Sequence, residues 1–378
     1  MKNKTILHLM GIGVAVMAAT SCGSTQYAVS TPGENLSALT KITDADYLCE
    51  HPFGGDNGRN LFFSMRDKNG SSSNIYKKDN PISASVTMKT SGKNQNMAPT
   101  YCEAIDKVAF SGRQEGGLNR DIYMVSGSEG NALSVVTTTP GEEENYPCLS
   151  RDGRSVVFEK RQTLNSPTDT EIWSKNLQTG ELVMLSIGRT PSYSPDGQTI
   201  TFVKYTDDGE NTCLWTMSSD GSNQMRLTDV NMGIVANPRF SPDGRKIVFQ
   251  CSKEEKEDYD LYVIERSGNN ITQLTINKSF DGEPYWANDG NIYFTSDRGG
   301  DDGNYQIWRF KFGGATSTST STTTKTVTYQ ATTHKVVRGE TITQIAQKYG
   351  VSVRDIVQWN GLRSMTLTPG MTLKVSAP

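Results

Sequence analysis

The residues that most often carry hydrolytic, metal or redox chemistry are scarce in this sequence of 378 residues. Two of its three histidines, His51 and His334, lie beyond residue 22. No HExxH zinc motif, no GxSxG nucleophile elbow and no CxxC pair occurs. The sequence therefore predicts a protein that is not an enzyme and that binds no cofactor or metal.

An excess of basic charge is also absent. The chain has 38 basic and 41 acidic residues and no basic stripe, which argues against a nucleic-acid partner. Acidic runs occur at residues 142–144, 207–208 and 301–302. Such runs are usually solvated loops, and the alternatives are a calcium site or an acidic active site.

A hydrophobic run long enough to cross a membrane is missing as well. The apolar stretch at residues 5–19 is too short for a spanning helix. Two lysines precede it, and small residues lead from it to Cys22. This order resembles a bacterial lipoprotein signal, which implies that residues 1–21 are removed and that Cys22 carries the lipid. The alternative is an ordinary secretory signal that is cut nearby.

The residues after the signal bear on location. Residues 22–35 are mostly small and polar, and we expect them to form a tether. Gly23 is not the aspartate that often retains lipoproteins at the inner membrane, and no acidic cluster of the kind used for surface export follows it. The resemblance therefore implies an anchor in the outer membrane with the chain facing the periplasm, and display at the cell surface stays open.

Five cysteines remain after Cys22, and an odd number cannot all pair within one chain. They are Cys49, Cys102, Cys148, Cys213 and Cys251. We expect mostly buried free thiols, and the alternative is a bridge from Cys49 to Cys102 or Cys148.

What the sequence does contain is an internal repeat. Residues 190–203 read TPSYSPDGQTITFV and residues 237–250 read NPRFSPDGRKIVFQ, with weaker copies on both sides. A proline opens each copy at intervals of 44–48 residues, at Pro52, Pro99, Pro147, Pro191, Pro238 and Pro284. We call these copies units one to six.

Each unit has room for about four short strands. A turn of the Ser-Pro-Asp-Gly type precedes an alternating strand, a further strand ends in an apolar-aromatic pair, and a last strand ends in Leu-Thr, as at residues 227–228. Four strands are the content of one propeller blade, so we predict a mainly β, six-bladed propeller at residues 36–312. The arrangement resembles the TolB-type, WD-like repeat, whose mark is xxSPDGxxIxF. In unit two, residues 103–106 replace the turn.

The aromatic residues of those pairs recur at one position of the repeat, which favours packing between blades over ligand binding. They are Tyr76, Tyr123, Trp173, Trp215, Tyr262 and Trp308. Loops that differ between units are better candidates for recognition. The long ones are residues 67–74, 81–97, 114–119, 161–170 and 252–258.

Closure of the ring gives a specific expectation. Unit six runs into low-complexity sequence before any Leu-Thr strand, whereas residues 36–40 contain a spare one that ends in Leu39 and Thr40. We expect residues 36–40 to supply the outer strand of unit six, so that no sheet edge stays open.

A second domain follows a linker. Residues 313–333 are rich in serine and threonine and predict a flexible linker before a domain at residues 334–378. Thr341 with Gln344 predicts the capped start of one helix, and Ser352 with Asp355 that of another. Strands at 335–337 and 372–375 complete a βααβ order.

The order VxxGETIxxIAxxYGVSVxxIVxWNGL…LxPGMxLxV in this domain resembles the LysM module. The resemblance implies binding of β-1,4-linked N-acetylglucosamine glycans, peptidoglycan among them, in a groove between two loops. By position these loops are Gly339, Glu340, Thr341 and Ile342, and Gly361, Leu362, Arg363, Ser364 and Met365. Ile342 and Met365 are expected to cover the sugar. The alternatives are that Thr341 is only a helix cap and that Leu362 is only core.

These features together suggest a function. The leading hypothesis is a cell-envelope lipoprotein that binds peptidoglycan through its last domain and scaffolds envelope proteins through its propeller. The alternatives are a sensor whose propeller binds a small ligand or peptide, and a glycan-acting enzyme subunit with an acidic channel.

Overall fold

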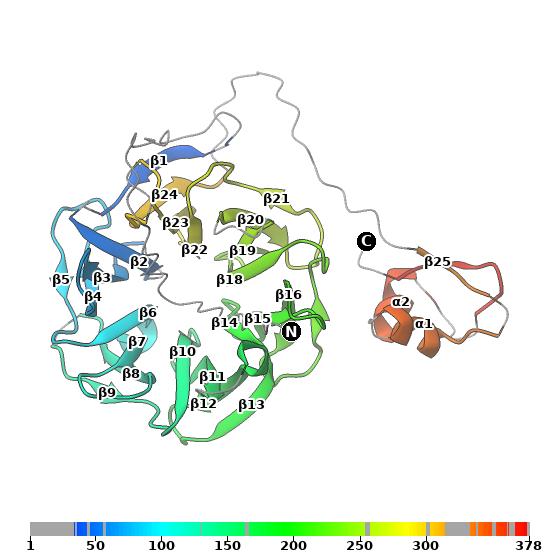
Figure 1. The fold of residues 1–378 in the computed structure, drawn as a ribbon, viewed down its shortest axis with the longest axis horizontal. Helices are drawn as coiled ribbons and strands as arrows, with labels where there is room; N and C mark the ends of the chain where they lie inside the picture. Colours follow the sequence, from blue (N-terminus) through cyan, green and yellow to red (C-terminus); the bar gives the residue numbers. More distant parts are fainter. Residues whose placement is uncertain are drawn as a thin grey trace, which may run out of the picture.

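The structure is a computed structural model, and it describes residues 34, 36–43, 46–55, 58–128, 130–162, 166–253, 258–299, 303–313, 333–337, 339–349, 353–360, 362 and 367–375. Residues 36–312 form mainly β structure, in which short antiparallel sheets stand around a ring (Figure 1). The first three units contain β2 (Tyr47–Gly54), β3 (Leu61–Asp67), β4 (Ser73–Lys78) and β5 (Thr87–Met88); β6 (Gln95–Cys102), β7 (Lys107–Arg113), β8 (Asp121–Ser126) and β9 (Ser134–Val135); and β10 (Glu142–Leu149), β11 (Ser155–Gln162), β12 (Glu171–Asn176) and β13 (Leu182–Ile187).

The other three units follow the same order. They contain β14 (Arg189–Tyr193), β15 (Thr199–Tyr205), β16 (Thr212–Ser218) and β17 (Met225–Arg226); β18 (Ile234–Phe240), β19 (Lys246–Ser252), β20 (Asp260–Glu265) and β21 (Thr272–Gln273); and β22 (Asp281–Trp286), β23 (Asn291–Ser296), β24 (Gln306–Lys311) and β1 (Ser37–Lys41). Units three to six are separate four-stranded sheets, and units one and two are joined by one parallel pair, Ser73 with Gln95.

The repeated prolines lie in the innermost strands, which are β2, β6, β10, β14, β18 and β22 (Figure 1). In each of these strands the pairing register shifts around the proline. The residue before the proline has a φ between 47° and 56°. Each proline therefore marks a β-bulge that redirects the preceding side chain.

The predicted turns form as their residues require. In unit five, the Oγ of Ser241 donates to the Oδ1 of Asp243, which also accepts from the backbone N–H of Arg245. Gly244 then takes a φ of 69°, which a residue with a Cβ rarely adopts. In unit two, the short 3₁₀ helix η1 (Glu103–Ile105) replaces this turn and ends at Asp106, whose φ is 48°. A second one, η2 (Pro167–Asp169), lies before β12.

The N-terminal strand completes unit six, which confirms the expected closure. β1 pairs antiparallel with β24, which is the last strand of the propeller in the sequence. The predicted Leu39–Thr40 pair is wrong in detail, because Ile42 and Thr43 occupy the repeat position. The N–H of Ile42 donates to the carbonyl of Ile307 at 2.8 Å, and the Oγ1 of Thr43 accepts from the N–H of Ile307 at 2.9 Å. Leu227 and Thr228 make the same two bonds to Leu214 in unit four.

Packing between neighbouring units forms the core, as the aromatic positions predicted. Tyr262 packs with Val203 and Leu214 of the preceding unit, and Trp215 packs against a cluster that contains Ile172 and Leu185. The other four aromatic residues of the set also pack in such clusters. They therefore hold the ring together.

The five cysteines are buried thiols, which confirms that expectation over a disulfide bridge. Burial raises the pKa of the Cys213 thiol to about 11 and that of the Cys251 thiol to about 12. These two thiols are therefore poor nucleophiles at neutral pH.

The C-terminal domain has its own small core. It contains β25 (Thr333–Lys335), α1 (Ile342–Tyr349), α2 (Val353–Asn360) and β26 (Thr372–Lys374), and β25 pairs antiparallel with β26. β25 begins two residues before the predicted strand. Val336, Ile345, Ile356 and Leu373 are at most 2% exposed in its core. Among the described residues, no helix is long and apolar enough to span a membrane.

Candidate functional site

The loop between β25 and α1 presents an open stretch of backbone. Gly339 has a φ of 91°, and no heavy atom of the described residues, its chain neighbours apart, lies within 4 Å of the position that a Cβ would take. Thr341 is exposed, and its Oγ1 accepts from the N–H of Gln344 while its own N–H donates to the Oε1 of Gln344. The predicted capping box is thus confirmed, and the described residues leave the backbone at Gly339 uncovered.

Glu340 fixes this loop to the sheet. Its Oε2 accepts from the N–H of Val337 at 2.8 Å and lies 2.8 Å from the Nε2 of His334, whose Nδ1 lies 3.0 Å from the hydroxyl of Tyr349. The bond from Val337 and the contact with His334 hold the pKa of Glu340 below its usual value. Glu340 therefore acts first as a positioning residue for the loop.

Ile342 does not lie where the sequence analysis placed its side chain. It is only 4% exposed and packs in the core of the domain, so it can offer a sugar its backbone but not a covering side chain. Leu362 also packs against this core. The remaining predicted positions, Gly361, Arg363, Ser364 and Met365, lie outside the described residues, as does Cys22.

A second candidate site lies on the axis of the ring. The residues before the six repeated prolines are His51, Ala98, Tyr146, Thr190, Asn237 and Glu283. Sequence reasoning missed them because they share no chemical type. Only their position before the repeated proline could have identified them.

Hydrogen bonds support the backbone at four positions of this axial set. In four units, the backbone N–H of the residue before the proline donates to a side chain of the preceding unit. In each case that acceptor residue comes directly after a buried phenylalanine in the second strand of the preceding unit. These bonds are Tyr146 to Ser111, Thr190 to Glu159, Glu283 to Gln250 and His51 to Thr295, at 2.7–3.2 Å. The axial positions are therefore rigid, and their side chains are free to differ.

One charged pair crosses from unit six to unit one at the axis. The Nε2 of His51 lies 2.9 Å from the Oε1 of Glu283. The other carboxylate oxygen of Glu283, Oε2, accepts from the backbone N–H of His51 and from the hydroxyl of Thr295. Burial opposes the charge on His51, but the carboxylate of Glu283 outweighs it and raises the pKa of His51. Burial likewise opposes ionisation of Glu283, and His51 nevertheless lowers the pKa of Glu283. The pair is an ion pair within a largely buried site.

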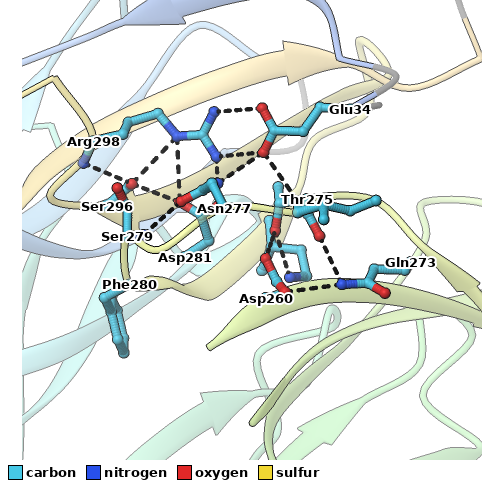
Figure 2. Close-up of polar contacts among 12 residues, drawn as sticks. Glu34, Asp260, Gln273, Thr275, Asn277, Ser279, Phe280, Asp281, Ser296 and Arg298 are labelled. Carbon is cyan, nitrogen blue, oxygen red and sulfur yellow. Dashed lines mark hydrogen bonds and ion pairs between the residues drawn. The ribbon is translucent and has the colours of Figure 1, made fainter. Parts of the chain in front are cut away.

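The end of the predicted tether is fixed to the ring, as Figure 2 shows. The guanidinium of Arg298 contacts both carboxylate oxygens of Glu34 at 3.3–3.4 Å and is also paired with Asp281. The N–H of Ile276 and the Nδ2 of Asn277 donate to the Oε1 of Glu34 at 3.1 and 2.7 Å. The side chains of Glu34 and Asp281 are 0% exposed. A single glutamate at the end of a polar stretch gave no signal of this role in the sequence.

A cavity of ≈ 480 Å³ lies between units three and four, beside their Asp-Gly turns. Its walls include Ser174, Tyr193, Asp152 and Asp196. Hydrogen bonds from serine hydroxyls and backbone N–H groups within the turns lower the pKa of Asp152 and of Asp196. The carboxylates therefore stabilise the turns, and the cavity is a polar hollow of ligand size.

Comparison with known proteins supports the architecture. The family described as TolB beta propeller domain (PD40) matches residues 190–372. A putative TolB from Agrobacterium tumefaciens superposes with a TM-score of 0.53 at 20% identity, over 72% of this chain and 96% of that one. A gluconolactonase from Xanthomonas campestris gives the same TM-score at 13% identity, over 72% of this chain and 88% of that one.

The matches to curated proteins are short but more similar in sequence. A probable endopeptidase p60 from Listeria innocua is 48% identical over 48 residues, and its counterpart from Listeria monocytogenes is 47% identical over 49 residues. Each match covers 13% of this chain and only 10% of the relative. The β sheets, the family match and the superpositions together show that this chain carries a TolB-like β-propeller domain.

Proposed function

We propose that this protein is a non-enzymatic cell-envelope lipoprotein that binds peptidoglycan through a LysM module and scaffolds envelope proteins through a six-bladed propeller. The observation that carries the proposal is the open loop at Gly339, in a domain whose sequence follows the LysM pattern. The N-acetyl group of a glucosamine residue can approach backbone amides and carbonyls where no Cβ intervenes.

The short relatives support a modular role. A stretch of 48 residues is about the size of one small domain, and at 48% identity it is far more similar than the propeller is to its structural neighbours. Sharing one module with bacterial endopeptidases fits a protein that works near the cell wall. The endopeptidase activity itself belongs to those relatives.

The proposed anchor at the other end is a lipid on Cys22, in the outer membrane and facing the periplasm. Glu34 supports a mechanical role for the tether, since its buried pair with Arg298 fixes where the tether leaves the propeller. A lipid and a glycan site on one chain raise each other's effective concentration, so that two weak attachments hold firmly.

Sedimentation with purified, insoluble peptidoglycan tests the glycan site. The soluble chain from Gly23 is expected to sediment, and a truncation that ends before Thr333 is expected to stay in the supernatant. Equal behaviour of the two chains would contradict the proposal. The same supernatants also test the non-enzymatic part, because soluble glycan fragments released over time would show that the chain cuts its ligand.

A sensor that binds a small polar ligand is the second candidate, and the ≈ 480 Å³ cavity between units three and four favours it. Under that function, Tyr193→Phe and Ser174→Ala would weaken ligand binding and leave peptidoglycan sedimentation unchanged.

A further inference from the structure

Arg239 reaches the axis of the ring from β18 of unit five. It follows Pro238, directly after the bulge, and its guanidinium carbon lies 5.9 Å from the ring centroid of Phe53 in unit one. Unit six lies between these two units in the ring (Figure 1). The side chain therefore extends past unit six into the centre.

The guanidinium of Arg239 is incompletely satisfied. Its Nη1 atom is buried and has no hydrogen-bond partner among the described residues. Burial lowers the pKa of Arg239, although the guanidinium stays charged at neutral pH. A buried N–H of a charged group that lacks a partner destabilises the folded protein, so such a group usually meets an acceptor.

A cavity lies in front of this group. It has a volume of ≈ 20 Å³ and is lined by residues of five units, among them Ala98, Tyr146, Asn237 and Arg239. The neighbouring side chains of His51 and Glu283 are 11% and 15% exposed, so solvent reaches this level of the axis. The space admits a water molecule or one oxygen of a group that projects into it.

The charge balance around the cavity selects the ligand. His51 and Glu283 form a pair with each other, and Glu50 lies 3.6 Å from Arg66. The carboxylate of Glu283 also acts to raise the pKa of Arg239, but His51 shares it, so His51, Glu283 and Arg239 together carry a net positive charge beside Tyr146 and Asn237. A small anion satisfies both this charge and the open N–H, and a carboxylate matches the planar guanidinium better than other anions of that size.

We propose that the axial cavity binds a carboxylate group through Arg239, presented by a partner peptide as an acidic side chain or as its C-terminus. A carboxylate projecting from an otherwise extended peptide places one oxygen in this narrow space, whereas the tetrahedral phosphate group is too bulky to approach it. The propeller would thus read its partner at the axis as well as through its loops.

Thermal unfolding of the chain from Gly23 in sodium acetate, sodium phosphate and sodium chloride at equal ionic strength tests this site. Acetate is expected to raise Tm over chloride in a saturable manner, and phosphate is not. Arg239→Gln should weaken the acetate effect by at least about tenfold. Arg266→Gln, which changes a partly exposed arginine between units four and five, should leave it unchanged.

A second variant adds a carboxylate to the cavity instead of removing the arginine that would bind it. Ala98 lines the cavity at a φ of 51°, a conformation that aspartate tolerates better than alanine. Ala98→Asp supplies the carboxylate from within the chain, so it should raise Tm by about 2–4 °C and remove the response to acetate. A fall in Tm for this variant, or an equal response to acetate and chloride in the parent chain, would overturn the proposal.

Peptides then separate the two sources of the carboxylate. Acetyl-Gly-Gly-Gly with a free C-terminus, its amide, and acetyl-Gly-Asp-Gly amide are compared by calorimetry. Binding of the first alone assigns a C-terminus, binding of the third alone assigns an acidic side chain, and equal binding of the uncharged amide would contradict carboxylate recognition. These outcomes do not depend on whether the C-terminal domain binds glycan.

Discussion

Single residues at the axis and at the tether show how a rigid repeat carries variable chemistry. The backbone before each repeated proline is held in one conformation, whereas the side chain there ranges from alanine to glutamate. A charge at such a site is stable only where a partner compensates it, as Glu283 compensates His51. The same rule applies to the acidic cluster of Glu34, Asp260 and Asp281. These three carboxyl groups share one guanidinium, that of Arg298.

Asp260 carries the clearest consequence of that excess. Its carboxylate accepts from Gln273 at 2.8 Å and from Thr275 at 3.0 Å (Figure 2). Burial and the neighbouring Asp281 raise the pKa of Asp260 to about 7, and Asp258 acts in the same direction. Because the folded state holds this proton more tightly than the unfolded state does, the stabilisation is present at low pH and is lost as pH rises through about 7.

Asp260→Asn is therefore expected to stabilise the protein at pH 8 by about 1–4 kcal/mol and to change little at pH 4. The free energy of unfolding, measured by urea denaturation of both chains at these two pH values, checks it. Asp220→Asn, in an exposed turn where hydrogen bonds from Ser222 lower the pKa of the aspartate, is the control and should bring no gain at pH 8. A gain that is equal at both pH values would contradict the assignment.

At the scale of the element, the strand that closes the ring is the critical one. β1 comes from the opposite end of the propeller segment from its partner β24, so the ring depends on contacts between residues far apart in sequence. Thr43 makes two of these contacts. It accepts from the N–H of Ile307 and donates to the Oε1 of Gln306 at 2.8 Å, and it is only 8% exposed.

Thr43→Val keeps the shape of the side chain but leaves the buried N–H of Ile307 without its acceptor. We expect a loss of about 1–3 kcal/mol in the free energy of unfolding. Thr40→Val is a matched control in the same segment, because Thr40 is exposed and its hydroxyl donates to the carbonyl of Ala38 two residues away. It should change stability by less than about 0.5 kcal/mol. Equal losses in the free energy of unfolding for the two variants would contradict the assignment of Ile42 and Thr43 to the repeat position.

The elements also show how far sequence reasoning reaches. Turns, middle strands and aromatic positions repeat in chemical type, so Asp243, Gly244 and Tyr262 were predictable from pattern alone. The bulges were not, because a positive φ before proline leaves no mark when the residue is tyrosine or glutamate. The shift from Thr40 to Thr43 escaped because two similar threonines lie three residues apart.

At the scale of the whole molecule, a rigid ring lies along the chain between two proposed attachments. The propeller fold is shown by its sheets and by its superposition on known propellers. For the C-terminal loop, the capping box of Thr341 was predictable, but the burial of Ile342 was not, since one apolar residue after a cap suits either a groove or a core. Contacts such as Glu34 with Arg298 join residues 264 positions apart and have no local signature.

The most direct test of the whole account is to load the lipid-modified full chain into fluorescent phospholipid vesicles and mix them with purified, insoluble peptidoglycan. The vesicles are expected to sediment with the peptidoglycan, and vesicles carrying the lipid-modified chain truncated before Thr333 are expected to stay in suspension. Vesicles that stay in suspension with the intact chain, or that sediment equally with both chains, would contradict the claim that this protein connects a membrane to the cell wall.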